Sequence, residues 1–152
     1  MIHLPEMKHF EGIRCMEYLL ENGLTCNVLD INRSTPLLYA ASRNQIAFIK
    51  LLRNFGSTIN NVNAFNQVPL IELIHQRNKL TLEQFDNLLS DEHLRSDFKD
   101  INDRNALHHL VSVAKNFDNS PEICKKLFEY GVNINSLDKY GRSPLFYCFI
   151  KI

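Results

Sequence analysis

Residues 30–60 of the chain read DINRSTPLLYAASRNQIAFIKLLRNFGSTIN, and this stretch contains the start and end signals of two short helices. Thr35 can cap a helix through its hydroxyl group, and Pro36 takes the first helical position, where a missing N–H costs nothing. Gly56 can adopt the left-handed backbone that ends a helix. The stretch therefore predicts a unit made of a loop, a helix, a turn and a second helix.

The same signals recur along the chain at a fixed spacing. A helix-ending residue is followed 12 positions later by a helix-starting residue, in the pairs Gly23 to Thr35, Gly56 to Val68, His93 to Asn105 and Gly131 to Ser143. The helix starts are 33, 37 and 38 residues apart, so extra residues are expected between the two helices of a unit, near 77–80 and 115–119. Because a two-helix unit this short cannot bury both faces alone, the units must stack into one array.

The array predicts one all-α domain over residues 1–152, a helical solenoid of stacked helix-turn-helix units with extended loops. The units are expected at 1–29 (partial), 30–62, 63–99, 100–137 and 138–152 (partial). Besides the helix before Gly56, second helices are predicted near residues 12–22, 81–90 and 121–130. Leu4 aligns with Leu37, so the chain is expected to open within a first helix. Another first helix is predicted near the other end, with an apolar face of Leu145, Phe146, Cys148 and Phe149.

The composition argues against several classes of function. Seventeen basic residues balance seventeen acidic ones and the isoelectric point is about 7.0, whereas nucleic-acid and membrane-surface binders carry a basic excess. No apolar run approaches the length of a membrane span, and no secretory signal is visible, so we expect a cytoplasmic or nuclear protein. The six histidines show no metal-ligand spacing, and no nucleophile or phosphate-binding motif is present. We expect no metal, no cofactor and no catalytic residue.

The unit resembles the ankyrin repeat. Thr35-Pro36-Leu37-Leu38 and Ala40-Ala41 stand where the family has Thr-Pro-Leu-His and two alanines, and residues 131–135 and 138–145 resemble the family's closing and opening segments. The chain departs from the pattern where Arg33, Asn66 and Asp103 replace the loop glycine and His93 replaces a helix-ending one. The resemblance covers essentially the whole chain and implies a divergent ankyrin array that binds another protein.

In proteins that this chain resembles, the loop tips and the exposed side of the first helices form the recognition surface. Carried over by position, the resemblance implies partner binding by nine residues: Arg33, Tyr39, Phe65, Glu72, Arg104, His109, Tyr140, Arg142 and Tyr147. Phe65 and Tyr140 are the anchors expected within this set, because aromatic residues at turn tips are unusual and aromatic residues dominate interfaces. Asn60 and Asn135 resemble asparagines that are hydroxylated in ankyrin proteins, although bracing of the loop by the side chain is the role that their chemistry favours.

These observations favour a non-catalytic protein–protein interaction module, acting as an adaptor or as an inhibitor like the ankyrin proteins that mask transcription factors. A structural segment of a longer channel, kinase or scaffold protein is the alternative, and an enzyme is a remote one. An apolar end also predicts self-association or contact with a partner, through Phe146, Phe149, Ile150 and Ile152.

Overall fold

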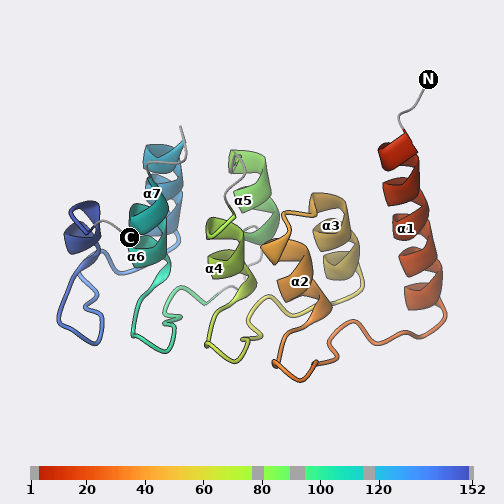
Figure 1. Ribbon diagram of the computed structural model, residues 1–152, viewed down its shortest axis with the longest axis horizontal. Helices are drawn as coiled ribbons and strands as arrows, with labels where there is room; N and C mark the ends of the chain where they lie inside the picture. The colour runs from red at the N-terminus through yellow and green to blue at the C-terminus, as the bar shows by residue number, and fades with distance from the viewer. Residues whose placement is uncertain (1–3, 77–80, 90–94, 115–118, 151–152) are drawn as a thin grey trace.

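The computed structural model describes residues 4–76, 81–89, 95–114 and 119–150, in which helices stand side by side and loops project from one side of the row (Figure 1). The chain starts with α1 (Leu4–Glu21), and three helix pairs follow: α2 (Pro36–Ser42) with α3 (Ile46–Asn54), α4 (Pro69–Ile74) with α5 (Leu82–Leu89), and α6 (Ala106–Val113) with α7 (Ser120–Glu129). A 3-10 helix, η2 (Pro144–Cys148), comes last. These residues contain no strand.

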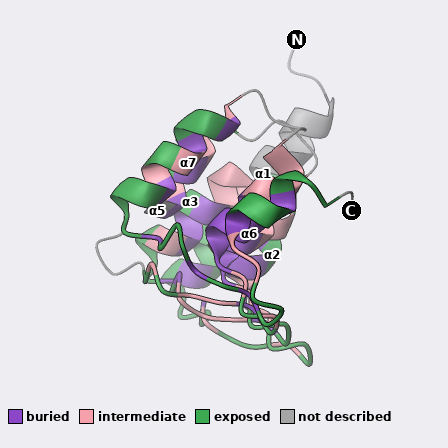
Figure 2. Ribbon diagram, turned by 90° about the vertical axis from the view of Figure 1, so that its left-hand side faces the viewer, coloured by how far each residue is buried: buried purple, intermediate pink, exposed green. Residues whose placement is uncertain are grey.

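The helices form two layers, which are visible when the row is viewed from its end (Figure 2). In one layer α2, α4, α6 and η2 pack against one another in chain order, and in the other α1, α3, α5 and α7 do the same. Each first helix also packs against the second helix of its own unit. The predicted all-α solenoid is therefore confirmed.

Local side-chain chemistry sets where the helices begin. The Thr35 hydroxyl accepts a hydrogen bond from the Leu38 N–H at 3.2 Å, as predicted, and Pro36 takes the first helical position. At α5, the Thr81 N–H donates to the Gln84 side chain at 2.7 Å, and the Gln84 N–H donates back to the Thr81 hydroxyl at 3.3 Å. Gly56 follows α3 with a φ of 82°, the left-handed conformation that glycine adopts without strain.

The core runs between the two layers and along the row. Leu37 and Ala41 of α2, Ile71 and Ile74 of α4, and Leu110 of α6 are almost completely buried. Complete burial of one such leucine or isoleucine side chain stabilises the fold by about 1.5–3 kcal/mol. Because these side chains pack against the next unit, the stability of each unit depends on its neighbours.

The structure corrects the prediction for the first unit. A turn was expected before a second helix near residues 12–22, but one continuous helix, α1, runs from Leu4 to Glu21. Residues 6–11 contain no glycine, proline or asparagine that could end a helix, and Gly12 is accommodated inside it. A Cβ atom at Gly12 would lie 3.6 Å from the ring of Phe48 in α3, which is an ordinary van der Waals distance, so this face of α1 packs against α3.

The last unit also differs from the prediction, because its helix is the short η2 and continues only to Cys148. Its apolar residues at the predicted stacking positions are exposed, namely Leu145, Phe146, Cys148 and Phe149. Ile150 is exposed as well, whereas Ile152 lies outside the described residues.

The expected lengthening between paired helices is confirmed. In the first complete unit, α2 ends at Ser42 and α3 begins at Ile46. In the next two units the gaps are longer, from Ile74 to Leu82 and from Val113 to Ser120. Residues 77–80, residues 115–118 and His93 lie outside the described part of the chain.

Candidate functional site

The loops between units end in four tips, residues 30–33, 63–66, 100–103 and 138–141, which lie side by side (Figure 1). Backbone hydrogen bonds connect each tip to the next. The Ala64 N–H donates to the Asn32 carbonyl at 2.9 Å, and the same contact joins Ile101 to Phe65 at 3.2 Å and Lys139 to Asn102 at 2.9 Å. We call this continuous row of four tips the tip ridge.

The tips share one backbone shape despite their different sequences. The fourth residue of each tip has a left-handed φ: 60° at Arg33, 56° at Asn66, 60° at Asp103 and 72° at Gly141. Only the last is the glycine that this conformation favours; Asn66 and Asp103 tolerate it better than most residues do, whereas Arg33 adopts it against its preference. The hydrogen bonds within and between tips must therefore compensate for this strain.

The first residue of every tip is an aspartate or asparagine that holds the loop closed. Asp30 Oδ1 accepts from the N–H groups of Asn32 at 2.8 Å and Ser34 at 2.7 Å. Equivalent pairs of bonds at 2.8–3.0 Å are made by Asn63, Asp100 and Asp138. A short polar side chain that accepts two backbone N–H groups replaces the hydrogen bonds that a tight turn would otherwise leave unmade.

The other polar atom of the same side chain contacts the first helix of its unit, at the residue nine positions later. The Tyr39 hydroxyl donates to Asp30 Oδ2 at 2.7 Å, and the Tyr147 hydroxyl donates to Asp138 Oδ2 at 2.8 Å. The remaining two pairs are Asn63 Nδ2 with Glu72 Oε1 at 2.7 Å and Asp100 Oδ2 with His109 Nε2 at 3.1 Å. We call these four contacts the tip–helix pairs.

The chemistry within each tip–helix pair is complementary. Where the tip carries an aspartate, which only accepts hydrogen bonds, the helix supplies a tyrosine or histidine. Where the tip carries Asn63, which can donate, the helix supplies the acceptor Glu72. Burial raises the pKa of Glu72, and the hydrogen bond from Asn63 opposes this effect.

In two of the tips, an arginine side chain binds the first aspartate of the tip. Arg104 contacts Asp100 at 2.6 Å, and Arg142 contacts Asp138 at 2.8 Å, each carboxylate being almost completely buried. Although burial by itself raises the pKa of both carboxyl groups, hydrogen bonds outweigh it and hold each pKa well below its usual value. They come from His109 and Arg104 at Asp100, and from Arg142 and Tyr147 at Asp138. Both aspartates are therefore ionised in the folded chain.

The Asp100 pair extends into a short row of rings between two units. His109 Nδ1 lies 2.7 Å from Nε2 of His75, at the end of α4, and the ring centroids are 4.7 Å apart. Burial is the largest cause that lowers the pKa of His75, to about 4, and the neighbouring His109 lowers it further. Burial also lowers the pKa of His109, whereas Asp100 raises it. When both rings are neutral, His75 can donate from Nε2 to Nδ1 of His109, and the single N–H of His109, at Nε2, then faces Asp100.

Four residues predicted to bind the partner are exposed. Phe65 and Tyr140 are 60% and 66% exposed at the tip ridge, and Arg33 and Tyr39 are also exposed. Tyr140 lies between two cations of its own tip, with the Arg142 guanidinium 4.6 Å and the Lys139 amine 5.0 Å from its ring centroid.

The structure corrects the exposure expected for His109 and Tyr147, which are only 1% and 4% exposed. Both side chains lie in tip–helix pairs, where a buried polar atom needs a partner inside the fold. Glu72, Arg104 and Arg142 are partly buried and brace their own tips. Sequence reasoning found these positions but missed their role, although an aspartate or asparagine with a polar helix residue nine positions later recurs in all four units.

The two loop asparagines behave differently. The Asn60 side chain is partly buried and accepts a hydrogen bond from the Arg95 N–H at 3.2 Å, which confirms that it braces the loop. The Asn135 residue is exposed, and its N–H donates to the Asn133 side chain at 2.8 Å. Their hydroxylation stays a prediction.

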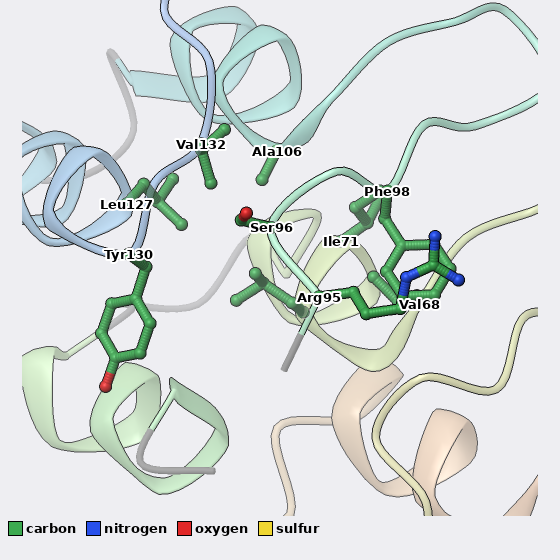
Figure 3. A pocket seen from close by; sticks show the side chains of 10 residues that line it. Val68, Ile71, Arg95, Ser96, Phe98, Ala106, Leu127, Tyr130 and Val132 are labelled. Carbon is green, nitrogen blue, oxygen red and sulfur yellow. The ribbon is translucent and has the colours of Figure 1, made fainter. Parts of the chain in front are cut away.

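A small apolar cavity lies between residues of the third and fourth units (Figure 3). Ile71, Ala106, Leu127 and Val132 line it, and it encloses about 10 Å³, roughly the room of one water molecule. It is therefore a packing gap and too small for a ligand. In the described part of the chain, His, Cys, Asp and Glu side chains form no cluster of three or more that could hold a metal ion. None of its helices combines the length and apolar character that a membrane crossing requires.

Comparison with known proteins agrees with this architecture. The family model described as ankyrin repeats (many copies) matches residues 7–53. The chain is similar to ankyrin repeat proteins. It is 28% identical to the ankyrin repeat protein FPV244 of fowlpox virus (strain NVSL) over 132 residues, which are 86% of this chain and 18% of that protein. It is 38% identical to the ankyrin repeat protein OPG189 of vaccinia virus (strain Copenhagen) over 63 residues, which are 41% of this chain and 11% of that protein.

The chain thus spans less than a fifth of the length of these curated relatives. Ankyrin repeats indicate a protein–protein interaction module, and the family is generally non-catalytic. The tip ridge and the adjoining edge of the first helices form the candidate site for such an interaction.

Proposed function

We propose that this ankyrin repeat array binds a partner protein across the tip ridge, as an adaptor or inhibitor with no catalytic activity of its own. The observation that carries the proposal is the exposure of Phe65 and Tyr140 on tips whose backbone is already held in place. An aromatic ring on a rigid support loses little conformational entropy on binding, so more of its burial energy contributes to affinity. The positions of Arg33 and Tyr39 beside the ridge support the same surface.

The test compares two double variants that remove equally exposed aromatic rings from different places. Phe65→Ala with Tyr140→Ala truncates the ridge, whereas Tyr18→Ala with Phe128→Ala removes rings of 65% and 59% exposure from α1 and α7. Arg104 is left intact, because its loss would expose the buried charge of Asp100.

Proteins captured from cell extract by the wild-type chain are identified by mass spectrometry, and each purified partner's affinity for both variants is then measured. The ridge variant is expected to bind at least about tenfold more weakly, since anchors of this kind cost 1–2 kcal/mol or more when truncated. The control variant should bind as the wild type does. Equal affinity of the two variants, with unchanged circular dichroism, would refute the proposed surface.

A second candidate function is self-association through the last unit. Leu145, Phe146 and Phe149 are exposed, whereas the equivalent residues of the second unit, Leu37 and Ala41 among them, are buried by the next unit. Contiguous exposed apolar side chains of this kind mark interaction sites. Light scattering should then show a dimer that forms with increasing concentration and is lost in Phe149→Ser. A monomer at high concentration would exclude this candidate.

A further inference from the structure

The loops of neighbouring units lie side by side, and we call the boundary between two such loops a seam. An asparagine side chain bridges two of these seams. Asn27 donates from Nδ2 to the Gly56 carbonyl at 3.1 Å and accepts at Oδ1 from the Thr58 N–H at 2.9 Å. One planar carboxamide thus joins a carbonyl and an N–H that lie two residues apart on the next unit. In the next seam Asn60 occupies the equivalent position and accepts from the Arg95 N–H at 3.2 Å.

The third seam has Asp97 at this position. An ionised aspartate has no N–H to donate, so it cannot reproduce the contact with a carbonyl. Its oxygens instead bind the Arg95 side chain at 3.1 and 2.9 Å, and Arg95 also lies 5.1 Å from the ring of Phe98. Among the described residues, no contact joins Asp97 to Gly131 or Asn133, the equivalents of Gly56 and Thr58.

A recess of about 400 Å³ opens at this seam, between Ser96 and Asp97 on one side and Gly131, Asn133 and Asn135 on the other. The backbone that faces it has the shape found at the closed seam, because the φ of Gly131 is 84° and that of Gly56 is 82°. In this turn the Gly131 carbonyl and the Asn133 N–H occupy the positions that the Gly56 carbonyl and the Thr58 N–H occupy at the closed seam.

The charged groups at the recess already have partners within the chain. Asp97 is paired with Arg95, and the Lys99 amine donates to the Leu137 carbonyl at 3.3 Å. Beside these charged groups, the recess presents polar side chains together with a backbone acceptor at Gly131 and a backbone donor at Asn133. Such a lining suits a neutral group that donates and accepts on the same side, and a carboxamide is such a group.

We propose that the recess binds the carboxamide of an asparagine or glutamine side chain of the partner protein, which takes the place that Asn27 takes in the first seam. Its NH2 group donates to the Gly131 carbonyl and its oxygen accepts from the Asn133 N–H. The inference rests on the proposed function for the presence of a protein partner, and it adds the chemistry of one contact. The recess directly precedes the tips 100–103 and 138–141, so a partner on the tip ridge can reach it.

Nuclear magnetic resonance tests the recess without a known partner. Acetamide, which is the isolated side-chain group, is titrated into the isotopically labelled full chain, and acetate serves as the isosteric control that cannot donate. We expect a saturable shift of the Asn133 N–H resonance with acetamide and none with acetate. The absence of a saturable acetamide shift at Asn133 would overturn the inference, and so would an equal response to acetate.

Two substitutions of one residue separate binding from general perturbation. Asp97→Asn supplies the chain's own carboxamide and should close the seam, so the acetamide shift should weaken by about tenfold or disappear. Asp97→Ala removes the same charge but supplies no carboxamide, so acetamide binding should persist. The inference is overturned if Asp97→Asn binds acetamide as the wild type does. The reverse change, Asn27→Asp, should open the first seam and produce an acetamide shift at the Thr58 N–H.

Partner binding distinguishes this inference from the proposed function. Asp97→Asn should lower the affinity of the chain for a captured partner, whereas Asp97→Ala should not. Both variants should keep the ridge contacts of Phe65 and Tyr140. If truncation of the ridge abolishes partner binding but Asp97→Asn leaves it unchanged, the recess inference fails and the proposed function stands. If ridge truncation leaves the partner bound, the proposed function fails whatever the acetamide titration shows.

Discussion

Replacing Asn63 by aspartate tests whether the tip–helix pairs depend on complementary chemistry. The Asn63 amide nitrogen lies 2.7 Å from a carboxylate oxygen of Glu72, and Asn63→Asp would place a second carboxylate against it. Two like charges about 4 Å apart repel by about 4 kcal/mol at the effective dielectric constant of 20 that suits sites near a protein surface. Protonation of Glu72 can relieve part of this energy, so we expect a loss of about 3 kcal/mol in the free energy of unfolding near pH 7.

The sign of the pH dependence follows from Glu72. Burial already raises its pKa above the usual 4.5, and a facing carboxylate would raise it further. A group whose pKa is higher in the folded than in the unfolded chain stabilises the fold fully at pH values below its pKa in the unfolded chain. This stabilisation is lost as the pH rises through its pKa in the folded chain. The variant should therefore be nearly as stable as the wild type near pH 4.5 and should fall behind as the pH increases toward 7.

A second substitution, patterned on two other units of the chain, should restore the lost stability. Asn63→Asp combined with Glu72→Tyr recreates the aspartate–tyrosine pair found at Asp30 and at Asp138, so stability should return to within about 1 kcal/mol of the wild type. Urea unfolding followed by circular dichroism measures all variants at both pH values. The control is Asn61→Asp, the same chemical change in a partly buried residue whose side chain bonds to no other described residue.

Two results would refute this reasoning. One is a loss below about 0.5 kcal/mol in Asn63→Asp near pH 7, no larger than that of a typical surface substitution such as the control. The other is recovery by Glu72→Ala that equals recovery by Glu72→Tyr, because removal of the repulsion alone would then explain the rescue.

Three further predictions concern stability. Burial lowers the pKa of His75 to about 4 in the folded chain. Between about pH 6.5 and 4 this histidine is therefore protonated in the unfolded chain but neutral in the folded chain, so the free energy of unfolding should decrease as the pH drops through this range. Although the His75 ring packs against His109, the residue as a whole is exposed to solvent, which reduces the expected loss to about 1–2 kcal/mol. His75→Gln should flatten this slope in urea titrations, and an unchanged slope would contradict the assignment. Thr35→Ala should cost about 1 kcal/mol through loss of the helix cap, whereas Thr35→Ser should keep most of it, and equal losses in thermal unfolding would disprove the cap. Arg33→Gly should raise the free energy of unfolding by about 1 kcal/mol because it relieves the left-handed backbone at a φ of 60°, and a less stable variant would show that the Arg33 side chain contributes more than this strain costs.

Much of the fold could be predicted because its signals are local. Thr35 with Pro36 starts a helix and Gly56 ends one through contacts within a few residues, so the sequence alone places those boundaries. The long helix α1 was missed for a related reason. Residues 6–11 carry no helix-ending signal, but the alignment of Leu4 with Leu37 outweighed that observation, and the alignment was misleading there.

The candidate site could be predicted only in part. The tip positions of Phe65 and Tyr140 follow from the repeat register, and their exposure agrees with the expectation. His109 and Tyr147 occupy helix positions that a simple projection of the repeat leaves outside, yet each is buried against an aspartate of its own loop. The repeat pattern indicates which face of a helix a residue lies on, but it does not indicate how the preceding loop folds back over that helix.

The sequence by itself thus determined the repeat, the starts of the first helices and the register of the tips, because hydrogen bonds between residues a few positions apart select the backbone conformation there. Only the tertiary structure decided which side chains remain available to a partner and where a seam stays open. Burial of His109 depends on His75, more than thirty residues away in the preceding unit, and the recess depends on Asp97 facing Gly131 in the next one. Those contacts exist only after the units have stacked, so no local pattern of residues contains them.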